Sequence, residues 1–376
     1  MSRPVRRLLV VLDDCGPGDA LVVDFCLEAA LAAHPEAEAD LLVSEQAAPV
    51  FARDRRFRRV IVSRLYEQRA RRRLLLVLRK IREAACLAVL LGRSYDLAIT
   101  FYWGTTWLNL LTRLASRGPN LGYANAWPQL LDSCLGRYRP EGDALSQAVR
   151  LMAAAGIDAA PAAPLPRPDR GETGAGWTLL GRHGLAASSR LAILHPGSDW
   201  ACQQWLIERW ATVADWLALE LGMDVVFTGV AAEAEPIERI RSLMRASSLS
   251  LAGATSVADL AALVRRAAIC VCVDSLAFEL AQAAGVPSVV LAGQSRTKAY
   301  GLRPVVPIVV NRTTPELRAA ILACKLSFEK ASYGGCLHYG CPMAGLRGIE
   351  VEDVKDAVLK ALPDGLTAQT AAGARS

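Results

Sequence analysis

The sequence lacks a long apolar run. None approaches the ~18–20 residues that a membrane-spanning helix needs, and the apolar segment before Asp13 is too short for a secretory signal. We therefore expect a cytoplasmic protein, in which the ten cysteines stay reduced.

The sequence also lacks any recognised nucleic-acid-binding motif. Thirteen basic and only two acidic residues lie between Arg53 and Arg82. We expect a long basic helix from Tyr66 to Leu91, and Tyr66 is its only aromatic residue. The pattern disfavours nucleic acid as a partner. It is compatible with a solvated helix face, or with a surface that attracts an anionic acceptor or the headgroups of the inner membrane.

Paired C-x-x-C spacings, which mark a zinc site, are absent. Cys324, Cys336 and Cys341 lie near the end of the chain in a glycine-rich stretch, where they are either packing cysteines or ligands of a metal. Cys270 and Cys272 alternate along an apolar run and are expected in the core.

What the sequence does contain is enough apolar residues, 52% of 376, for two domains. Short apolar strands alternate with helical segments, which predicts parallel, doubly wound sheets. We expect an N-terminal domain over 1–160, a Pro/Gly/Ala-rich linker over 161–176, a C-terminal domain over 177–363 and a disordered tail over 364–376.

The segment Cys270–Gly293 reads as strand, tight loop, helix and strand. Asp274 and Ser275 stand in the loop and favour a helix cap. The start of a helix at the carboxyl end of a parallel strand binds anions, because its backbone N–H groups are free. The segment predicts a diphosphate site.

Three further loops follow predicted strands. Asp13–Asp19 contains glycines and ends on a carboxylate that either caps the next helix or accepts a proton from a hydroxyl nucleophile. His195–Trp205 is either a plain turn with a satisfied histidine or part of a ligand site. Thr228–Glu233 ends on an acid that either binds ribose hydroxyls or favours the helix dipole.

The order of these loops resembles glycosyltransferase family 9, the lipopolysaccharide heptosyltransferases and their relatives, from about residue 6 to residue 361. The matching pieces, in chain order, are Gly18-Asp19, His195-Pro196-Gly197 with Trp205, Gly229 with Glu233, Leu251-Ala252-Gly253 with Thr255-Ser256, and Asp274-Ser275 with Ala283–Pro287.

The resemblance implies a GT-B fold, an α/β fold of two Rossmann-like domains facing a central cleft. It implies inverting, metal-independent transfer of a sugar, typically heptose from an ADP-activated donor, with Asp19 as the general base. The expected donor-binding residues are His195, Gly197, Ser198, Gln203, Gly229, Glu233, Asp274, Ser275 and Glu279. The expected acceptor-binding residues are Gly18, Trp103 and Thr105.

Three positions depart from the family pattern. Leu276 and Glu279 replace the usual glycine and histidine after Asp-Ser, and Gln203 replaces a basic residue. Two cations for the diphosphate are thereby lost, and Arg296 or Lys298 could substitute for them.

Two other functions remain open. The chain could be a non-catalytic GT-B protein that binds or scaffolds, or a protein-modifying heptosyltransferase with a cysteine-bound metal. The partners expected for the enzyme are a nucleotide-sugar donor and an acceptor saccharide, protein or small molecule.

Overall fold

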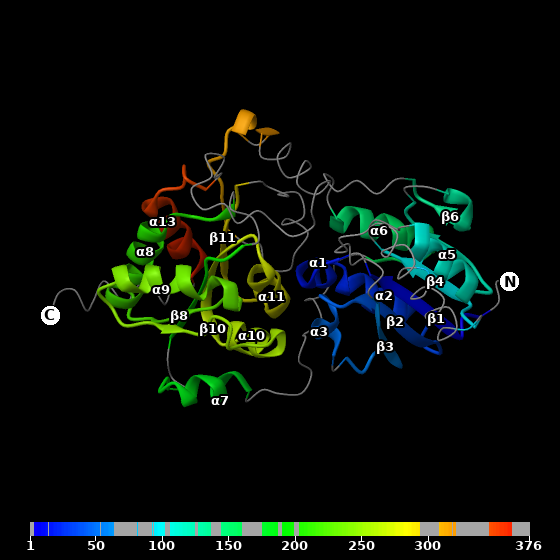
Figure 1. The fold of residues 1–376 in the computed structure, drawn as a ribbon, viewed down its shortest axis with the longest axis horizontal. Helices are drawn as coiled ribbons and strands as arrows, with labels where there is room; N and C mark the ends of the chain where they lie inside the picture. The colour runs from blue at the N-terminus through cyan, green and yellow to red at the C-terminus, as the bar shows by residue number, and fades with distance from the viewer. Residues whose placement is uncertain are drawn as a thin grey trace. The chain divides into compact units, whose positions relative to one another are not determined.

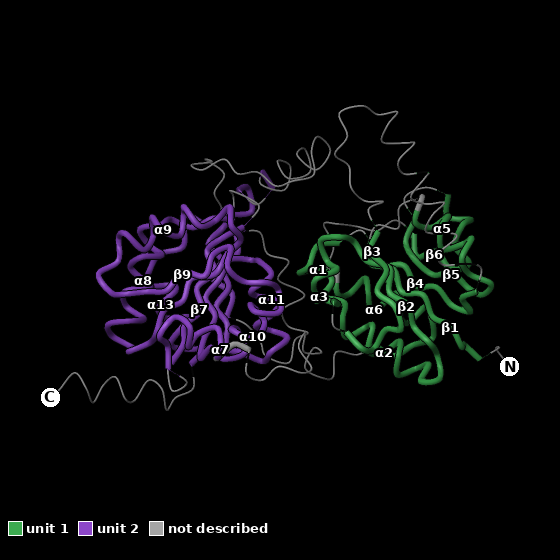
Figure 2. Tube along the Cα trace, turned by 60° about the horizontal axis from the view of Figure 1, so that its bottom comes forward, with its two compact units in different colours: residues 1–168 green, residues 169–376 purple. Residues whose placement is uncertain are grey.

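The fold was analysed in a computed structural model. It describes residues 4–13, 15–52, 54–63, 81, 92, 94–101, 106–124, 127–136, 144–159, 175–186, 190–198, 203–293, 308–317, 319–320 and 346–362. The chain forms two compact units, Met1–Pro168 and Asp169–Ser376 (Figure 2). The expected linker and domain limits stay predictions.

Unit 1 holds one parallel sheet and the helices that connect its strands. Its strands are β1 (Arg7–Leu12), β2 (Glu38–Ser44), β3 (Arg59–Ser63), β4 (Leu97–Thr100), β5 (Asn120–Gly122) and β6 (Ser133–Cys134). Its helices are α1 (Pro17–Val22), α2 (Asp24–Ala33), α3 (Ala48–Phe51), α5 (Thr106–Ala115), the 3₁₀ turn η1 (Pro128–Leu130) and α6 (Ala144–Ala154).

The strands of unit 1 lie in the order β3-β2-β1-β4-β5-β6. This is the Rossmann order, in which the first strand is central and the connections reverse direction between the first and fourth strands. The strand exits of β1 and β4 therefore meet at a topological switch point, where such sheets bind ligands.

Unit 2 repeats the arrangement. Its strands are β7 (Leu191–His195), β8 (Asp224–Phe227), β9 (Leu249–Ser250), β10 (Ala267–Val273), β11 (Ser288–Leu291) and β12 (Ile308–Val310), in the order β12-β11-β10-β7-β8-β9. Its helices are α7 (Ala175–Arg182), α8 (Ile207–Leu219), the 3₁₀ turn η3 (Ala231–Glu233), α9 (Ala234–Leu243), α10 (Val257–Val264), α11 (Leu276–Ala284) and α13 (Val351–Ala361). Here the switch point lies between β7 and β10.

Helices cover both faces of the sheet of unit 2. Figure 1 shows α8, α9 and α13 on one side of the strands and α10 and α11 on the other. A continuous apolar core joins the first three helices to the strands, and each central strand is buried over its last five residues. The expected α/β fold with two Rossmann-like domains is confirmed.

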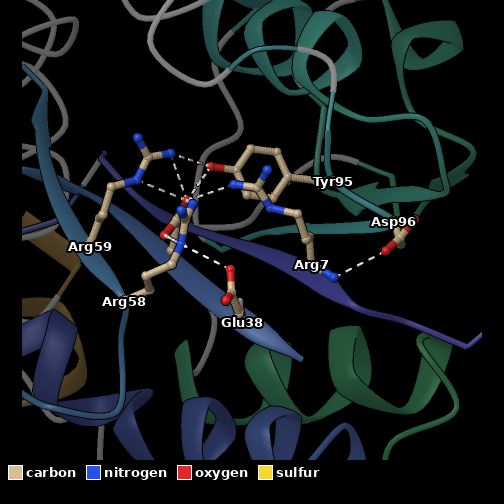
Figure 3. A network of polar contacts seen from close by, with 7 residues as sticks. Arg7, Glu38, Arg58, Arg59, Tyr95 and Asp96 are labelled. Carbon is tan, nitrogen blue, oxygen red and sulfur yellow. Dashed lines mark hydrogen bonds and ion pairs between the residues drawn. The ribbon is translucent and has the colours of Figure 1, made fainter. Parts of the chain in front are cut away.

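At the amino edge of the sheet of unit 1, the fully buried Asp40 accepts hydrogen bonds from Arg58, Arg59 and Tyr95 (Figure 3). Burial alone would raise the pKa of the Asp40 carboxyl, but these hydrogen bonds outweigh it and hold the pKa below its usual value. The Arg7 guanidinium lies 3.7 Å from the same carboxylate. Ligand-binding loops in such sheets follow the carboxyl ends of the strands, whereas this network lies at the amino ends. Its role is therefore structural.

One local prediction is wrong. The loop expected over Asp13–Asp19 is shorter, because α1 already begins at Pro17, and a break at Val23 separates α1 from α2. Proline suits the first helical position, because its missing N–H would have no partner there.

Candidate functional site

The best-defined part of the site is a carboxylate held between two glycines in unit 2. Gly197 follows β7, Gly229 follows β8, and the side chain of Glu233 folds back against both. A Cβ added to Gly197 would lie 2.0 Å from the Glu233 Cδ, and one added to Gly229 would lie 2.6 Å from Oε2. The Val230 N–H donates to Oε2 at 2.8 Å. We call Gly197, Gly229 and Glu233 the Glu233 notch.

A third loop, which follows β9, contacts the notch. The Gly253 N–H donates to the Gly229 carbonyl at 2.9 Å, and Gly253 has a φ of +72°. An added Cβ would lie 2.9 Å from the Ala231 Cα, so only glycine fits both the conformation and the space. Loops after three neighbouring strands thus fix the position of one acid.

His195 ends β7 beneath this loop cluster. Its Nδ1 lies 2.9 Å from the Thr228 hydroxyl, and the residue is buried. Burial lowers the pKa of His195 to about 4, so the imidazole is neutral near pH 7. Thr228 was not singled out as a functional residue, although it opens a loop that the sequence marked.

The neutral His195 predicts a pH dependence of stability. The pKa of this histidine is depressed in the folded chain. Between about pH 6.5 and about pH 4, protons therefore bind the unfolded chain in preference to the folded chain, and acidification over this range destabilises the fold. This group alone should lower the free energy of unfolding by about 2–3 kcal/mol between pH 7 and pH 4.5.

The measurement is urea unfolding of the natural chain and of His195→Gln at both pH values. The variant should be less stable at pH 7 but should lose less stability on acidification. Equal losses in the two proteins would contradict a buried neutral histidine.

Ser198 and Gln203 form the next part of the loop after β7. The Ser198 hydroxyl donates to the Gln203 Oε1 at 2.9 Å, and Gln203 is buried. A neutral amide therefore stands where the family pattern has a cation, with its oxygen engaged by the loop itself.

On the other side of the switch point, strand β10 ends at Val273 and helix α11 begins at Leu276. Ser275 is the N-cap of this nine-residue helix, and its side chain accepts no capping hydrogen bond. Glu279 lies in the first turn and is 8% exposed. The structure thus brings Asp274, Ser275 and Glu279 to one helix start, as the sequence predicts.

Cys270 and Cys272 are fully buried in β10, as expected. Burial, with smaller effects from the Cys270 thiol and the neighbouring acids, raises the pKa of the Cys272 thiol far above its usual value. A buried thiol of this kind is unreactive.

In unit 1, the loop after β1 carries Asp19. The Ser44 hydroxyl at the end of β2 donates to the Cys15 carbonyl at 2.7 Å, which fixes the loop. Asp19 is the third residue of α1, half-buried, and its Oδ2 accepts the Gly16 N–H at 3.4 Å. Gly18 precedes it in the same turn. The interaction of Ser44 was not foreseen, although it is a polar residue in an otherwise apolar strand end.

Several predicted site residues lie outside the described residues. They are Trp103, Thr105, Arg296, Lys298, Cys324, Cys336 and Cys341. Within the residues that the structure does describe, no group of three His, Cys, Asp or Glu side chains could hold a metal ion, and no helix is long and apolar enough to cross a membrane.

Comparison with protein families identifies one match. The model of "Glycosyltransferase family 9 (heptosyltransferase)" matches residues 147–332, from α6 through the notch and α11. The chain carries a glycosyltransferase family 9 domain. The family 9 resemblance and the assignment as a glycosyltransferase are thereby confirmed, while no curated protein matches the sequence.

Solved structures agree on the fold. A glycosyltransferase of family 9 from Veillonella parvula is 18% identical with a TM-score of 0.69, covering 95% of this chain and 97% of that chain. The ADP-heptose lps heptosyltransferase II of E. coli is 18% identical with a TM-score of 0.63, covering 87% and 100%. The chain therefore shares the GT-B fold of these glycosyltransferases.

A more distant neighbour is described as iron-containing. It is the dodecameric glycosyltransferase TibC from enterotoxigenic E. coli, 12% identical with a TM-score of 0.52, covering 96% of this chain and 77% of that chain.

Proposed function

We propose that this family 9 glycosyltransferase transfers a heptose from ADP-heptose to an acceptor hydroxyl, with inversion at the anomeric carbon and without a metal ion. The observation that carries the proposal is the Glu233 notch. A carboxylate held at the strand exits of a Rossmann sheet is suited to accept hydrogen bonds from the two hydroxyls of a ribose.

The diphosphate would bind beside the notch, at the start of α11. The backbone N–H groups of its first turn and the Ser275 hydroxyl can donate to phosphate oxygens. Gly197 and Ser198 offer further backbone donors from the loop after β7. Arg296 and Lys298, in the chain that follows β11, would supply the positive charge that Gln203 and Glu279 do not.

Asp19 would act as the general base. It accepts the proton of the acceptor hydroxyl while that oxygen attacks the anomeric carbon, and the bond from this carbon to the diphosphate oxygen breaks. A single displacement of this kind inverts the anomeric centre and releases ADP. Gly18, Trp103 and Thr105 would line the acceptor site of unit 1.

The name of the E. coli neighbour supports a lipopolysaccharide acceptor, and we propose such a lipid-linked saccharide acceptor here, with the enzyme at the cytoplasmic side of the inner membrane. The iron-containing neighbour favours one alternative, a protein-modifying heptosyltransferase whose metal is bound by Cys324, Cys336 and Cys341. A non-catalytic GT-B binding protein is the other alternative, and the losses at Gln203 and Leu276 favour it.

The test is a thermal-shift screen with ADP-heptose, ADP-, GDP- and UDP-hexoses and free ADP. A ligand that binds only the folded chain raises the Tm, by a few degrees when present at about 100 times its Kd. We expect ADP-heptose to raise it most. No shift with any nucleotide sugar would refute the proposed donor site.

Activity assays and elemental analysis of the same purified protein distinguish the proposed enzyme from the two alternatives. Donor binding without transfer or hydrolysis identifies a binding protein. Iron in elemental analysis, together with transfer that a strong chelator abolishes, identifies the metal-dependent enzyme.

A further inference from the structure

The loop that carries Asp19 is anchored by a side chain of the neighbouring strand. Ser44 is the last residue of β2 and is 4% exposed. Its hydroxyl accepts the Ala47 N–H at 3.1 Å and lies 2.7 Å from the Cys15 carbonyl oxygen. A carbonyl carries no proton, so the hydroxyl donates to Cys15. One buried hydroxyl therefore connects the loop after β1 with the loop after β2.

The carbonyl that Ser44 binds belongs to the peptide unit between Cys15 and Gly16. The N–H of this same unit donates to the Asp19 Oδ2 at 3.4 Å. A peptide unit is planar and trans, so its C=O and its N–H point in opposite directions, and fixing one fixes the other. The Ser44 hydroxyl and the Asp19 carboxylate are thus joined through one rigid group of atoms.

Gly16 makes this peptide unit easy to rotate unless a hydrogen bond holds it. Glycine adopts positive and negative φ with similar ease, and a Cβ added to Gly16 would meet only the Asp19 Oδ2 at 3.9 Å, an ordinary contact distance. Crowding therefore does not hold the unit in place. The 3.4 Å bond to Asp19 is longer than the usual range of about 2.7–3.2 Å, so a small rotation of the unit would break it.

The helices that follow the two loops pack against each other. Helix α1, which contains Asp19, contacts α3, and Figures 1 and 2 both show the two side by side. Leu21 of α1 and Phe51 of α3 are each 1% exposed. This packing fixes the position of α1 but not the rotation of the Asp19 carboxylate, because the terminal torsion of an aspartate is soft. The Gly16 N–H restrains that rotation.

We propose that Ser44 is a positioning residue for the general base. Its hydrogen bond to Cys15 keeps the Gly16 N–H directed at the Asp19 carboxylate. A base must lie within hydrogen-bond reach of the proton that it removes, and a displacement of about 1 Å can lower the rate about a hundredfold. The inference rests on the proposed function, because Ser44 acts through Asp19.

The experiment compares Ser44→Thr with Ser44→Val. Threonine and valine have nearly the same shape, so overpacking at this buried site is common to both, and only threonine keeps the hydroxyl. We expect Ser44→Val to lower kcat about tenfold to a hundredfold with KM for ADP-heptose unchanged, and Ser44→Thr to retain most of the rate. Ser44→Ala, which adds no atom, should behave like Ser44→Val. Initial rates of ADP release from ADP-heptose, with truncated lipopolysaccharide as the acceptor, measure both constants.

A double-mutant cycle and a control separate positioning from a general loosening of the fold. Because Ser44 acts through Asp19, Ser44→Val should cause no further loss of rate in the Asp19→Asn background. The control is Ser116→Ala at the amino edge of the same sheet. Ser116 is also buried, and its hydroxyl donates to the carbonyls of Tyr95 at 3.1 Å and Gly118 at 3.0 Å. Its loss should leave kcat unchanged.

A second readout needs neither donor nor acceptor. In protein labelled with ¹⁵N-glycine, the Gly16 amide signal is assigned by its disappearance in Gly16→Ala. This signal should move in Asp19→Asn and in Ser44→Val, and much less in Ser44→Thr, because only the last keeps the peptide unit directed at the carboxylate. An equal signal position in the two Ser44 variants would overturn the proposal.

Three kinetic results would also overturn it. They are equal rates for Ser44→Thr and Ser44→Val, the same loss from Ser44→Val with and without Asp19, and a loss in Ser116→Ala as large as in Ser44→Ala. The two possible failures are distinguishable. Asp19→Asn at the natural rate contradicts the proposed base, whereas a slow Asp19→Asn with equal rates of the two Ser44 variants contradicts the positioning role alone.

Discussion

Replacing Asp19 with asparagine is expected to slow sugar transfer by about a hundredfold to ten-thousandfold, the usual contribution of a general base. The amide cannot take the proton of the acceptor hydroxyl, but it keeps an oxygen for the Gly16 N–H. Helix α1 should therefore persist, and the affinity for ADP-heptose should stay unchanged. Initial rates of ADP release and a donor titration measure the two effects separately.

The matched control is Asp353→Asn. Asp353 is also the third residue of its helix, α13, and accepts the Glu350 N–H at 2.9 Å, but it is not among the predicted catalytic, donor-binding or acceptor-binding residues. It should leave the transfer rate unchanged. If Asp19→Asn behaves like this control, Asp19 only caps its helix and another group removes the proton.

Replacing Gly197 with alanine is expected to weaken donor binding by about a hundredfold. The new methyl group would lie 2.0 Å from the Glu233 Cδ, so the carboxylate must leave the notch and its charge-assisted hydrogen bonds to the ribose are lost. Overpacking at this point should also lower the free energy of unfolding by about 1–3 kcal/mol. Calorimetric titration with ADP-heptose and urea unfolding are the two measurements.

A second substitution distinguishes the two effects. In Gly197→Ala/Glu233→Ala the clash is gone, so stability should recover while the affinity stays low. Recovery of affinity in the double variant would mean that Glu233 does not bind the donor and that Gly197 acts through shape alone.

The parts of the fold that the sequence predicts best are long apolar strands bounded by turn residues. The strand before Asp274, the helix after Ser275 and the break at Gly285 follow from local chemistry, because capping and left-handed backbone depend on neighbouring residues. Strands β6 and β9, two residues each, carry no periodicity and were not foreseen.

Interactions between distant segments were harder to predict. Asp40 looks like an ordinary strand residue, and the arginines near it look like part of a solvated basic run, until the register of β2 and β3 brings them together. The Glu233 notch was foreseen only as a list of residues. That Glu233 touches both glycines depends on the exits of β7 and β8 lying side by side, which local sequence does not determine.

The strand order has a consequence for synthesis of the chain. The central strand of unit 2, β7, finds its second neighbour only when β10 appears some seventy residues later, and β1 waits still longer for β4. Loop-closure entropy opposes such distant pairings. Each half-made sheet therefore leaves the ribosome with an open, apolar edge, which favours chaperone binding during translation.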